Sequence, residues 1–379
     1  MRTFKSTQQD MQARIVREVR SGRATARAGL AHLLEIAPST MGIHVDELVR
    51  SGYLVESGLE RGSAGRPKRL LKLVSQAGWF AGVEFTGGRI QAARLDFAGK
   101  LERNLQESLP SDISAAQMID KIEAVVRELH NGATGPCFGI GIGSPGLVNP
   151  AEGVVVYSQF QPDWKQVPLA QELQKRFGMR VLVENNLHVI TLAERWFGEG
   201  RDEDDFVVVR ARMGFGLGIV KGGRLLPGAH HATGEVGMLP WPLERGLRQV
   251  HEAFSARSVW QKLSGNHDNS PPEDLRAALT SLADSRGEVW DAVVTDYARL
   301  LGVIQLIVDA RRYFLHGTLA ALGTRFCDDI MRRSIELMPE LKHSPIRLGP
   351  TSLGRDAGAL GAASLAMEVW NPAEAKPSA

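Results

Sequence analysis

The sequence predicts an α/β protein in two parts, a small basic helical module followed by a larger α/β body. The first observation is a change of pattern near Gly78, where amphipathic helical segments give way to strand-like runs that end at glycines. The second is charge: residues 1–75 hold 13 Lys and Arg against 7 Asp and Glu, whereas the remainder holds 32 against 36. This asymmetry indicates that only the first part meets a polyanion.

Bulk composition narrows the class of protein. Of the 379 residues 43% are hydrophobic and 23% are charged, which argues against global disorder. No apolar leader segment and no 18-residue apolar run occurs, so we expect neither a signal peptide nor a membrane partner. The two cysteines, Cys137 and Cys327, form no CxxC, which is typical of a reducing compartment. We expect a cytoplasmic protein with no metal or other cofactor.

Three helical segments open the chain. Residues 8–20 carry apolar side chains at i, i+4 and i+8, and residues 25–36 place leucines on one face. The third segment begins at Pro38, whose missing N–H costs nothing in a first helical turn, and ends at Gly52.

Two strand-like runs, 53–56 and 70–74, follow these helices and flank a segment rich in Gly and Arg. Three helices and a two-stranded wing predict a winged helix-turn-helix over residues 1–75. The alternative is a three-helix packing domain with no role in DNA binding.

From Gly78 onward, strands alternate with helices, as expected for an α/β body with a mixed sheet. The expected strands lie in GWFAGVEFTGGRIQAARLDFAGKL, CFGIGIGSPGLV, GMRVLVEN, DFVVVRARMGFGLGIVKGGRLL and GTLAALGT. The expected helices cover roughly 114–130, 168–177, 187–197, 289–309 and 355–369. The body is predicted to span residues 76–370, and the tail 371–379 to be disordered.

The order of several motifs is more specific than any one of them. A Gly-Arg-Pro wing precedes GIGIGSPGLVNPAEGVV, VENN, GEVG and LGRDAGALGAA. This order resembles the ROK family (repressors, open-reading-frame proteins and sugar kinases), specifically its DNA-binding repressor branch, from about Gln8 to Met367. The resemblance implies a two-lobed actin-like, ribonuclease H-like ATPase fold for the body, with a sugar bound between the lobes.

The segments that match the phosphate turns of the family's kinases depart from the kinase pattern. The first turn, D-x-G-G-T-K in kinases, here covers Glu84 to Arg89, with Thr86 where a glycine lets the backbone approach phosphate. The second turn covers Arg212 to Gly218, where Arg and Met replace a glycine and a threonine. We expect no tight ATP binding.

The stretch VLVENNLHVI matches the strand end where the family's kinases keep their catalytic Asp, and Asn186 stands at that position. An amide has no useful basicity near neutral pH, but it can donate and accept hydrogen bonds. We therefore predict no catalytic residue and no kinase activity, and a position that holds a hydroxyl without activating it.

The family's zinc motif is also absent. Met238 stands at the position of its histidine and no cysteine follows, so we expect no zinc, which needs three or four close ligands. The resemblance places Glu235 and Glu252 where relatives hold sugar hydroxyls, and Gly146 at a backbone contact. The predicted ligand residues are Gly146, Asn185, Asn186, Glu235 and Glu252. The alternative is a vestigial cleft whose amides only cap a helix.

For DNA, the first residues of the third helix are expected to face the major groove. Arg66, beside Pro67 in a Gly-flanked loop, resembles an AT-hook core that lies in a narrow minor groove. The alternative is a plain basic linker. The predicted DNA-binding residues are Pro38, Ser39, Thr40, Ile43, His44, Arg66, Lys68 and Arg69.

Together these patterns predict a homo-oligomeric transcriptional regulator, more specifically a repressor. It would bind a palindromic, partly A·T-rich operator, with a sugar or sugar-like effector in the body. One alternative is a hexose or N-acetylhexosamine kinase with an attached DNA-binding domain. Another is a ligand-independent DNA-binding protein whose body only makes the dimer or tetramer.

Overall fold

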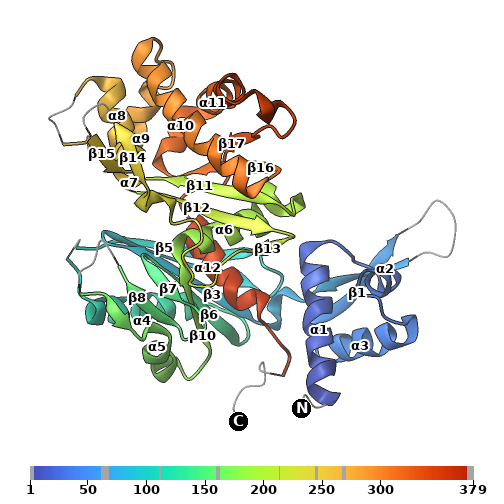
Figure 1. Ribbon diagram of the computed structural model, residues 1–379. Helices are drawn as coiled ribbons and strands as arrows, with labels where there is room; N and C mark the ends of the chain where they lie inside the picture. Colours follow the sequence, from blue (N-terminus) through green and yellow to red (C-terminus); the bar gives the residue numbers. More distant parts are fainter. Residues whose placement is uncertain are drawn as a thin grey trace. The chain divides into compact units, whose positions relative to one another are not determined.

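The computed structural model describes residues 4–60, 68–110, 112–158, 163–212, 214–243, 246–266 and 270–373 (Figure 1). The chain divides into two compact units. The first is Met1–Val189 with Arg355–Ala379, and the second is Ile190–Gly354.

The first unit begins with an N-terminal module of helices and one hairpin. The three expected helices and the two expected strands are present, with the strands antiparallel. Leu30 and Val45 are fully buried between the helices, which gives the module a core of its own. The elements are α1 (Phe4–Ser21), α2 (Arg27–Leu33), α3 (Pro38–Arg50), β1 (Leu54–Glu60) and β2 (Lys68–Leu73).

Ion pairs connect the elements of this module. Arg27 donates to Asp46 Oδ1 on α3 at 2.6 Å and to Glu56 Oε1 on β1 at 3.0 Å. Arg69 on β2 donates to Glu56 Oε2 at 2.5 Å, and the two guanidinium groups lower the pKa of the Glu56 carboxyl. The pairs lie near the surface, so each adds little stability, but together they fix the hairpin against α2 and α3.

The first unit also holds a five-stranded mixed sheet in the order β10-β6-β3-β4-β5. β3, β4 and β5 are antiparallel, while β6 and β10 run parallel to β3, as the sequence predicted. The strands are β3 (Trp79–Thr86), β4 (Arg89–Asp96), β5 (Leu101–Ser108), β6 (Cys137–Ser144) and β10 (Val181–Asn185). A second sheet joins β7 (Leu147–Asn149), β8 (Val154–Tyr157) and β9 (Lys165–Val167).

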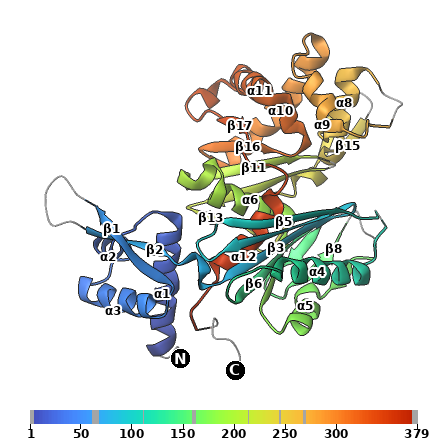
Figure 2. The ribbon, with the colours of Figure 1, turned by 180° about the vertical axis from the view of Figure 1, so that it is seen from behind.

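Helices cover both faces of the five-stranded sheet. Val83 packs in one core with α4 (Ala115–His130) and α5 (Leu169–Phe177), whereas its neighbour Gly82 faces α12 (Ala357–Glu368). This follows from the alternation of side chains along a strand. Both views show α4 and α5 together and apart from α12 (Figures 1 and 2).

The contact of α12 with the sheet is made by backbone. A Cβ at Gly82 would lie 2.1 Å from Ala359 O, and one at Gly141 would lie 1.7 Å from Ala362 O. Glycines in β3 and β6 therefore let the helix approach closer than any side chain would allow. The small-residue sequence AGALGAASLAME of α12 serves the same contact.

The N-terminal module is joined to this α/β part through Arg20, near the end of α1. Its Nη2 and Nε donate to Phe97 O at 2.8 and 3.1 Å, and its Nη1 donates to Met367 O at 3.2 Å. The guanidinium also lies over the rings of Phe80 and Phe97, 5.5 and 5.0 Å from their centroids. Burial lowers the pKa of Arg20 to about 9, so the group stays charged at neutral pH.

The second unit is built on a sheet in the order β13-β12-β11-β16-β17. Its strands are β11 (Phe206–Ala211), β12 (Phe215–Lys221), β13 (Arg224–Leu225), β16 (Arg312–His316) and β17 (Leu348–Pro350). A separate hairpin pairs β14 (Pro240–Leu243) with β15 (Gly246–Gln249). Its helices are α7 (Val250–Ala253), α8 (Ala256–Ser264), α9 (Leu275–Ser281), α10 (Glu288–Val308) and α11 (Gly323–Leu337). α6 (Asn186–Phe197) runs across the boundary between the units. Short 3₁₀ turns lie at Ser75–Ala77, Glu199–Asp202, Val236–Met238, Thr318–Leu322 and Pro339–Lys342.

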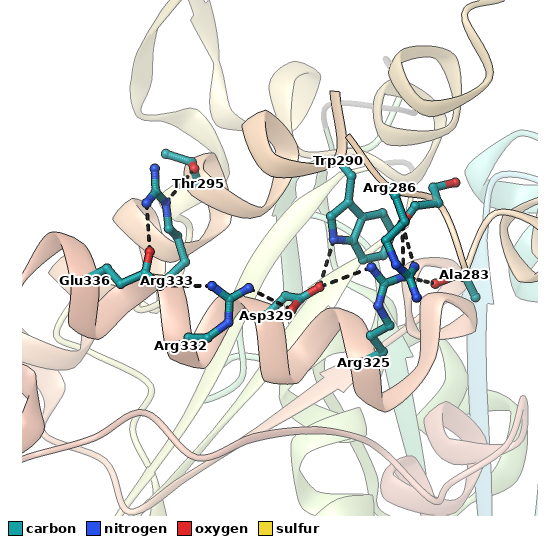
Figure 3. Close-up of polar contacts among 10 residues, drawn as sticks. Ala283, Arg286, Trp290, Thr295, Arg325, Asp329, Arg332, Arg333 and Glu336 are labelled. Carbon is teal, nitrogen blue, oxygen red and sulfur yellow. Dashed lines mark hydrogen bonds and ion pairs between the residues drawn. The ribbon is translucent and has the colours of Figure 1, made fainter. Parts of the chain in front are cut away.

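Polar contacts hold α10 against α11 (Figure 3). Trp290 Nε1 donates to Asp329 Oδ2 at 2.9 Å, and the Arg325 guanidinium lies 4.6 Å from the centroid of the Trp290 ring. Further along, Arg333 Nε donates to Thr295 Oγ1 at 3.0 Å. One face of α10 is therefore committed to α11.

The five predicted helices of the body are all confirmed, with bounds within two residues of those expected. GTLAALGT was wrong as a strand. It forms a 3₁₀ turn between Gly317 and Gly323, both at positive φ, and leads into α11, while the strand lies just before it at β16. Within the described residues no helix has the length and apolar character to cross a membrane. Asn371, assigned to the disordered tail, donates to Asp10 Oδ1 at 3.3 Å, and residues 374–379 lie outside the described part.

Candidate functional site

The start of α3 presents a polar and apolar surface outward. Pro38, Ser39 and Thr40 are exposed in its first turn, and Ile43 follows with 63% of its surface exposed. The residue before the helix, Ala37, has no side chain that can cap it, so the first amides of α3 receive no side-chain acceptor there. Four of the predicted DNA-binding residues thus share one accessible helix end.

His44 does not lie on the exposed surface of α3 where the sequence predicted it. It is only 8% exposed and lies with Met41, Val45 and Leu48 on the inner face of α3, one helical step from Ile43. Burial lowers the pKa of its imidazole, which favours the neutral ring. We therefore correct the prediction: His44 belongs to the core of the module and not to a DNA-reading surface.

The predicted basic wing is only partly described. Arg69 is well exposed in β2, but its guanidinium is paired with Glu56, which reduces the positive charge that it offers to a phosphate. Lys68 is the first residue of β2. Arg66, with Pro67, lies outside the described residues.

Asn185 ends strand β10 and caps the helix that follows. Its Oδ1 accepts from Leu187 N at 2.7 Å and from His188 N at 3.4 Å, and its Nδ2 donates to Gly146 O at 2.7 Å. Both ends of the amide are thus used by the chain itself, as in a helix cap. These bonds make Asn185 a helix cap, which is the alternative that the sequence left open, and its ligand role stays a prediction.

Two buried side chains, Glu184 and His188, contact each other beneath this cap. Glu184 Oε1 accepts from Asn185 N at 2.8 Å and lies 3.0 Å from His188 Nδ1, and both side chains are buried. The sequence analysis did not predict this couple. The i, i+4 spacing of Glu184 and His188 at the start of a helix is the pattern that could have indicated it. The couple fixes the backbone on both sides of Asn186.

Asn186 is the first residue of α6 and is buried. Gly146 faces the same cap, and its φ of +86° and the 2.1 Å that a Cβ would leave to Tyr157 O require glycine there. The structure thus brings Asn185, Asn186 and Gly146 together in the first unit. A carboxamide at position 186 can hold a hydroxyl but cannot accept its proton.

The end of β3, the segment that resembles the first phosphate turn of the kinases, carries a buried carboxylate. Glu84 is buried, and a Cβ at Gly358, in the first turn of α12, would lie 2.6 Å from Glu84 Cγ. Arg89 Nη2 is 3.9 Å from Glu84 Oε2. The first turn of a helix attracts anions because its amide groups carry partial positive charge. The Glu84 carboxylate lies beside the first turn of α12, where an anion would bind.

Glu235 and Glu252 belong to the second unit, Glu235 just before a 3₁₀ turn and Glu252 exposed in α7. Near them, His251 Nδ1 accepts from Phe215 N at 3.0 Å. Burial, with the charge of Arg210, lowers the pKa of His251 and keeps this nitrogen an acceptor. No group of three or more His, Cys, Asp or Glu in the described ranges is arranged to hold a metal.

Comparison with known proteins identifies the family. The family model described as "ROK family" matches residues 80–369. The chain belongs to the ROK family. The match covers the two five-stranded sheets and α12, so the resemblance seen in the motifs is confirmed.

Relatives in this family are regulators and kinases. The xylose repressor of Caldicellulosiruptor bescii is 27% identical over 227 residues, which is 59% of this chain and 56% of that repressor. The glucokinase of Thermotoga maritima is 26% identical over 309 residues, 76% of this chain and 96% of the kinase. The chain thus matches only about half of the repressor's length.

A solved structure extends the similarity to nearly the whole chain. It is described as a ROK family transcriptional regulator, a homolog of the E. coli Mlc protein. It aligns with a TM-score of 0.78 at 19% identity and covers 96% of this chain and 97% of that one. At this identity the likeness shows a shared fold, including the region of the N-terminal module.

Proposed function

We propose that this chain is a transcriptional regulator of the repressor type that binds operator DNA through its N-terminal module. The observation that carries the proposal is the start of α3, which turns Ser39, Thr40 and Ile43 outward while its opposite face is buried. An isoleucine that is 63% exposed contributes little to the core, but it suits contact with a thymine methyl group.

The finer architecture of the proposal is a winged helix-turn-helix. α2 and α3 form the helix pair, α3 enters the major groove, and the β1–β2 hairpin is the wing. The uncapped amides at the start of α3 and the hydroxyls of Ser39 and Thr40 contact phosphate or base edges. Two copies on a palindromic operator place one module on each half-site. The body is the two-lobed actin-like part, which holds the effector and joins the copies.

DNA binding is tested with 40-bp duplexes enriched from a random library by the full chain. We expect Thr40→Glu to lower the affinity for the enriched duplexes at least 100-fold, since a carboxylate would face phosphate. Ile43→Ala should lower it about 10-fold, which corresponds to about 1.4 kcal/mol. Fluorescence anisotropy across a salt series gives both values.

The matched control is Thr280→Glu, on an exposed threonine of α9, which should leave affinity unchanged. Enrichment of no sequence above the starting library, or a Thr40→Glu variant that binds like the unaltered protein, would rule out this DNA surface.

For the body, we propose that a sugar or sugar-like effector is bound without chemistry. In the first unit, Asn186 and the backbone at Gly146 supply hydrogen bonds to hydroxyl groups, and Asn185 holds the cap that positions Asn186. In the second unit, Glu235 and Glu252 are each proposed as acceptors for a hydroxyl group. What supports this proposal is the amide at position 186, because it offers hydrogen bonds and no base. The names of the relatives, a xylose repressor and a glucokinase, place sugars in the class to be tested.

Thermal shift with D-xylose, D-glucose and N-acetyl-D-glucosamine should raise the melting temperature with at least one sugar. Asn186→Ala should abolish the shift, whereas Asn131→Ala, at an exposed asparagine after α4, should keep it. A coupled ATP assay with the same sugars should release no ADP. ADP release lost in Asn186→Ala would establish the kinase alternative, and no shift with any of these sugars would support a ligand-independent protein.

A further inference from the structure

One carboxylate of the β1–β2 hairpin, that of Glu56, is shared by two arginines. Its Oε1 accepts from Arg27 Nη2 at 3.0 Å, and its Oε2 accepts from Arg69 Nη1 at 2.5 Å. Arg27 belongs to α2, whereas Glu56 and Arg69 stand on the two strands of the hairpin. Each oxygen of the Glu56 carboxylate therefore has a charged donor of its own.

This carboxylate lies close to the exposed start of α3. Arg27 Nη1 donates to Gly42 O at 3.3 Å, and Gly42 directly precedes Ile43, the exposed residue proposed to contact a base. Through Arg27, Glu56 is thus two hydrogen bonds away from the backbone of the proposed reading helix. A negative charge at this place repels the phosphates of an approaching duplex.

The two arginines are held differently. The Arg27 side chain is 33% exposed and has three acceptors, namely Gly42 O, Asp46 Oδ1 and Glu56 Oε1. The Arg69 side chain is 71% exposed, and among the bonds of the described residues Glu56 is its one acceptor. Arg69 can therefore leave Glu56 by rotating its own side chain, whereas Arg27 is fixed.

Opening of the Glu56–Arg69 pair leaves no carboxylate without a partner. Arg27 still donates to Glu56, which stays in place on β1. The hydrogen bonds from Arg69 and Arg27 lower the pKa of the Glu56 carboxyl, so the group is charged at neutral pH. A phosphate that binds Arg69 only replaces one anion by another, and it gains less than it would from an unoccupied cation.

We propose that Glu56 is a positioning residue that restrains DNA binding, because it holds Arg69 in an ion pair within the hairpin and withholds this cation from phosphate. The inference rests on the proposed function and deepens it by naming the residue that limits the phosphate contacts of the hairpin. Phosphate contacts carry no sequence information, so the restraint acts alike on every DNA sequence.

Glu56→Gln in the full chain tests the inference, with an enriched duplex and an unrelated duplex of the same length. Glutamine keeps an oxygen that accepts from Arg27, but it has no charge to hold Arg69. Affinity for both duplexes should rise about 3-fold or more at low salt. The slope of log affinity against log salt should steepen by about 0.9, the value for one more neutralised phosphate. A merely structural role of Glu56 would not steepen this slope.

A double-mutant cycle with Arg69→Ala identifies the cation that is released. In the unaltered chain this change should lower affinity less than about 2-fold, because Arg69 is occupied by Glu56. In the Glu56→Gln chain it should lower affinity about 3-fold or more and so remove the gain. The comparison holds even if glutamine lowers the melting temperature, since both chains with glutamine carry that loss alike.

Asp46→Asn is the matched control. Asp46 is a carboxylate on α3 that is 60% exposed and pairs with Arg27, so its loss frees no cation of the hairpin and the salt slope should stay unchanged. A Glu56→Gln chain with unchanged affinity and slope overturns the inference. Weaker binding by this chain also overturns it, because Glu56 would then present Arg69 to the DNA. Both results leave DNA binding by the unaltered chain standing, whereas an unaltered chain that binds no duplex overturns the proposed function itself.

Discussion

Gly141→Ala is expected to lower the free energy of unfolding by about 3 kcal/mol or more, the upper range for overpacking a core. Gly141 lies in β6, and a Cβ there would stand 1.7 Å from Ala362 O and 2.7 Å from the adjoining carbonyl carbon. The obstacle is the backbone of α12, which cannot rotate away as a side chain would. The helix must therefore shift off the sheet.

A shift of α12 would disturb more than its contact with Gly141. Gly82 in β3 meets the same helix at 2.1 Å from Ala359 O, so the helix is seated on two strands at once. Raising α12 at Gly141 would open the buried surface beside Ala362 and Ala363, both fully buried. The weaker apolar packing there would add to the cost of the clash.

Urea denaturation of Gly141→Ala followed by circular dichroism measures this destabilisation. Gly88→Ala is the control, because Gly88 has no atom within 4 Å of a Cβ and no positive φ, and alanine there should change stability by less than about 0.5 kcal/mol. A Gly141→Ala midpoint equal to that of Gly88→Ala would mean that α12 does not rest on the sheet as described.

Elements with strong periodicity could be predicted from the sequence alone. The helix expected at 289–309 and the strand that ends at Asn185 have clear apolar patterns bounded by polar residues. GTLAALGT could not be assigned in this way, because a short apolar run between glycines fits a strand, a turn or a helix start equally well. Its structure depends on the positive φ of Gly317 and Gly323, which the letters alone do not give.

Individual site residues were harder to predict than elements. His44 and Ile43 are neighbours on one helix, and only the packing of α3 decides which of them faces inward. Asn185 and Asn186 are likewise adjacent, but Asn185 caps α6 through its Oδ1, which accepts from Leu187 N, while its Nδ2 donates to Gly146 O. The Glu184–His188 couple depends on the strand turning directly into the helix, which brings the two side chains to 3.0 Å. Such assignments depend on three-dimensional neighbours and not on residue type.

Arg20→Leu is expected to loosen the N-terminal module from the rest of the first unit. Arg20 carries three hydrogen bonds to the carbonyls of Phe97 and Met367, and leucine would leave these acceptors without their donor. Each buried carbonyl that loses its donor costs about 1–3 kcal/mol. Arg17 Nη2, which donates to Glu368 O at 3.1 Å, and Asp10, which accepts from Asn371 Nδ2 at 3.3 Å, would still tie α1 to the end of α12 and the residues after it.

An aromatic cluster would remain but would not replace these bonds. Tyr53, just before β1, packs on Phe97 and Trp370 with ring centroids 5.3 and 4.8 Å away, so leucine at position 20 would still contact apolar surface. Aromatic rings can shift against one another and stay in contact, whereas hydrogen bonds to fixed carbonyls hold α1 in one orientation. We therefore expect the variant to keep its fold and lose the defined placement of α1.

Hydrogen exchange read by mass spectrometry distinguishes these effects. In Arg20→Leu the amides of α1 should exchange at least 10-fold faster, while those of β3 and β6 keep their protection. Arg23→Ala is the matched control, just after α1. Arg23 is half exposed and its ion pair with Glu18 is long, at 3.9 Å, so the amides of α1 in this variant should exchange as in the unaltered protein. The effect of Arg20→Leu should persist in 1 M salt, because its bonds are buried, whereas any effect at Arg23 would be screened. Equal exchange in the two variants would show that α1 is held by the aromatic cluster and not by Arg20.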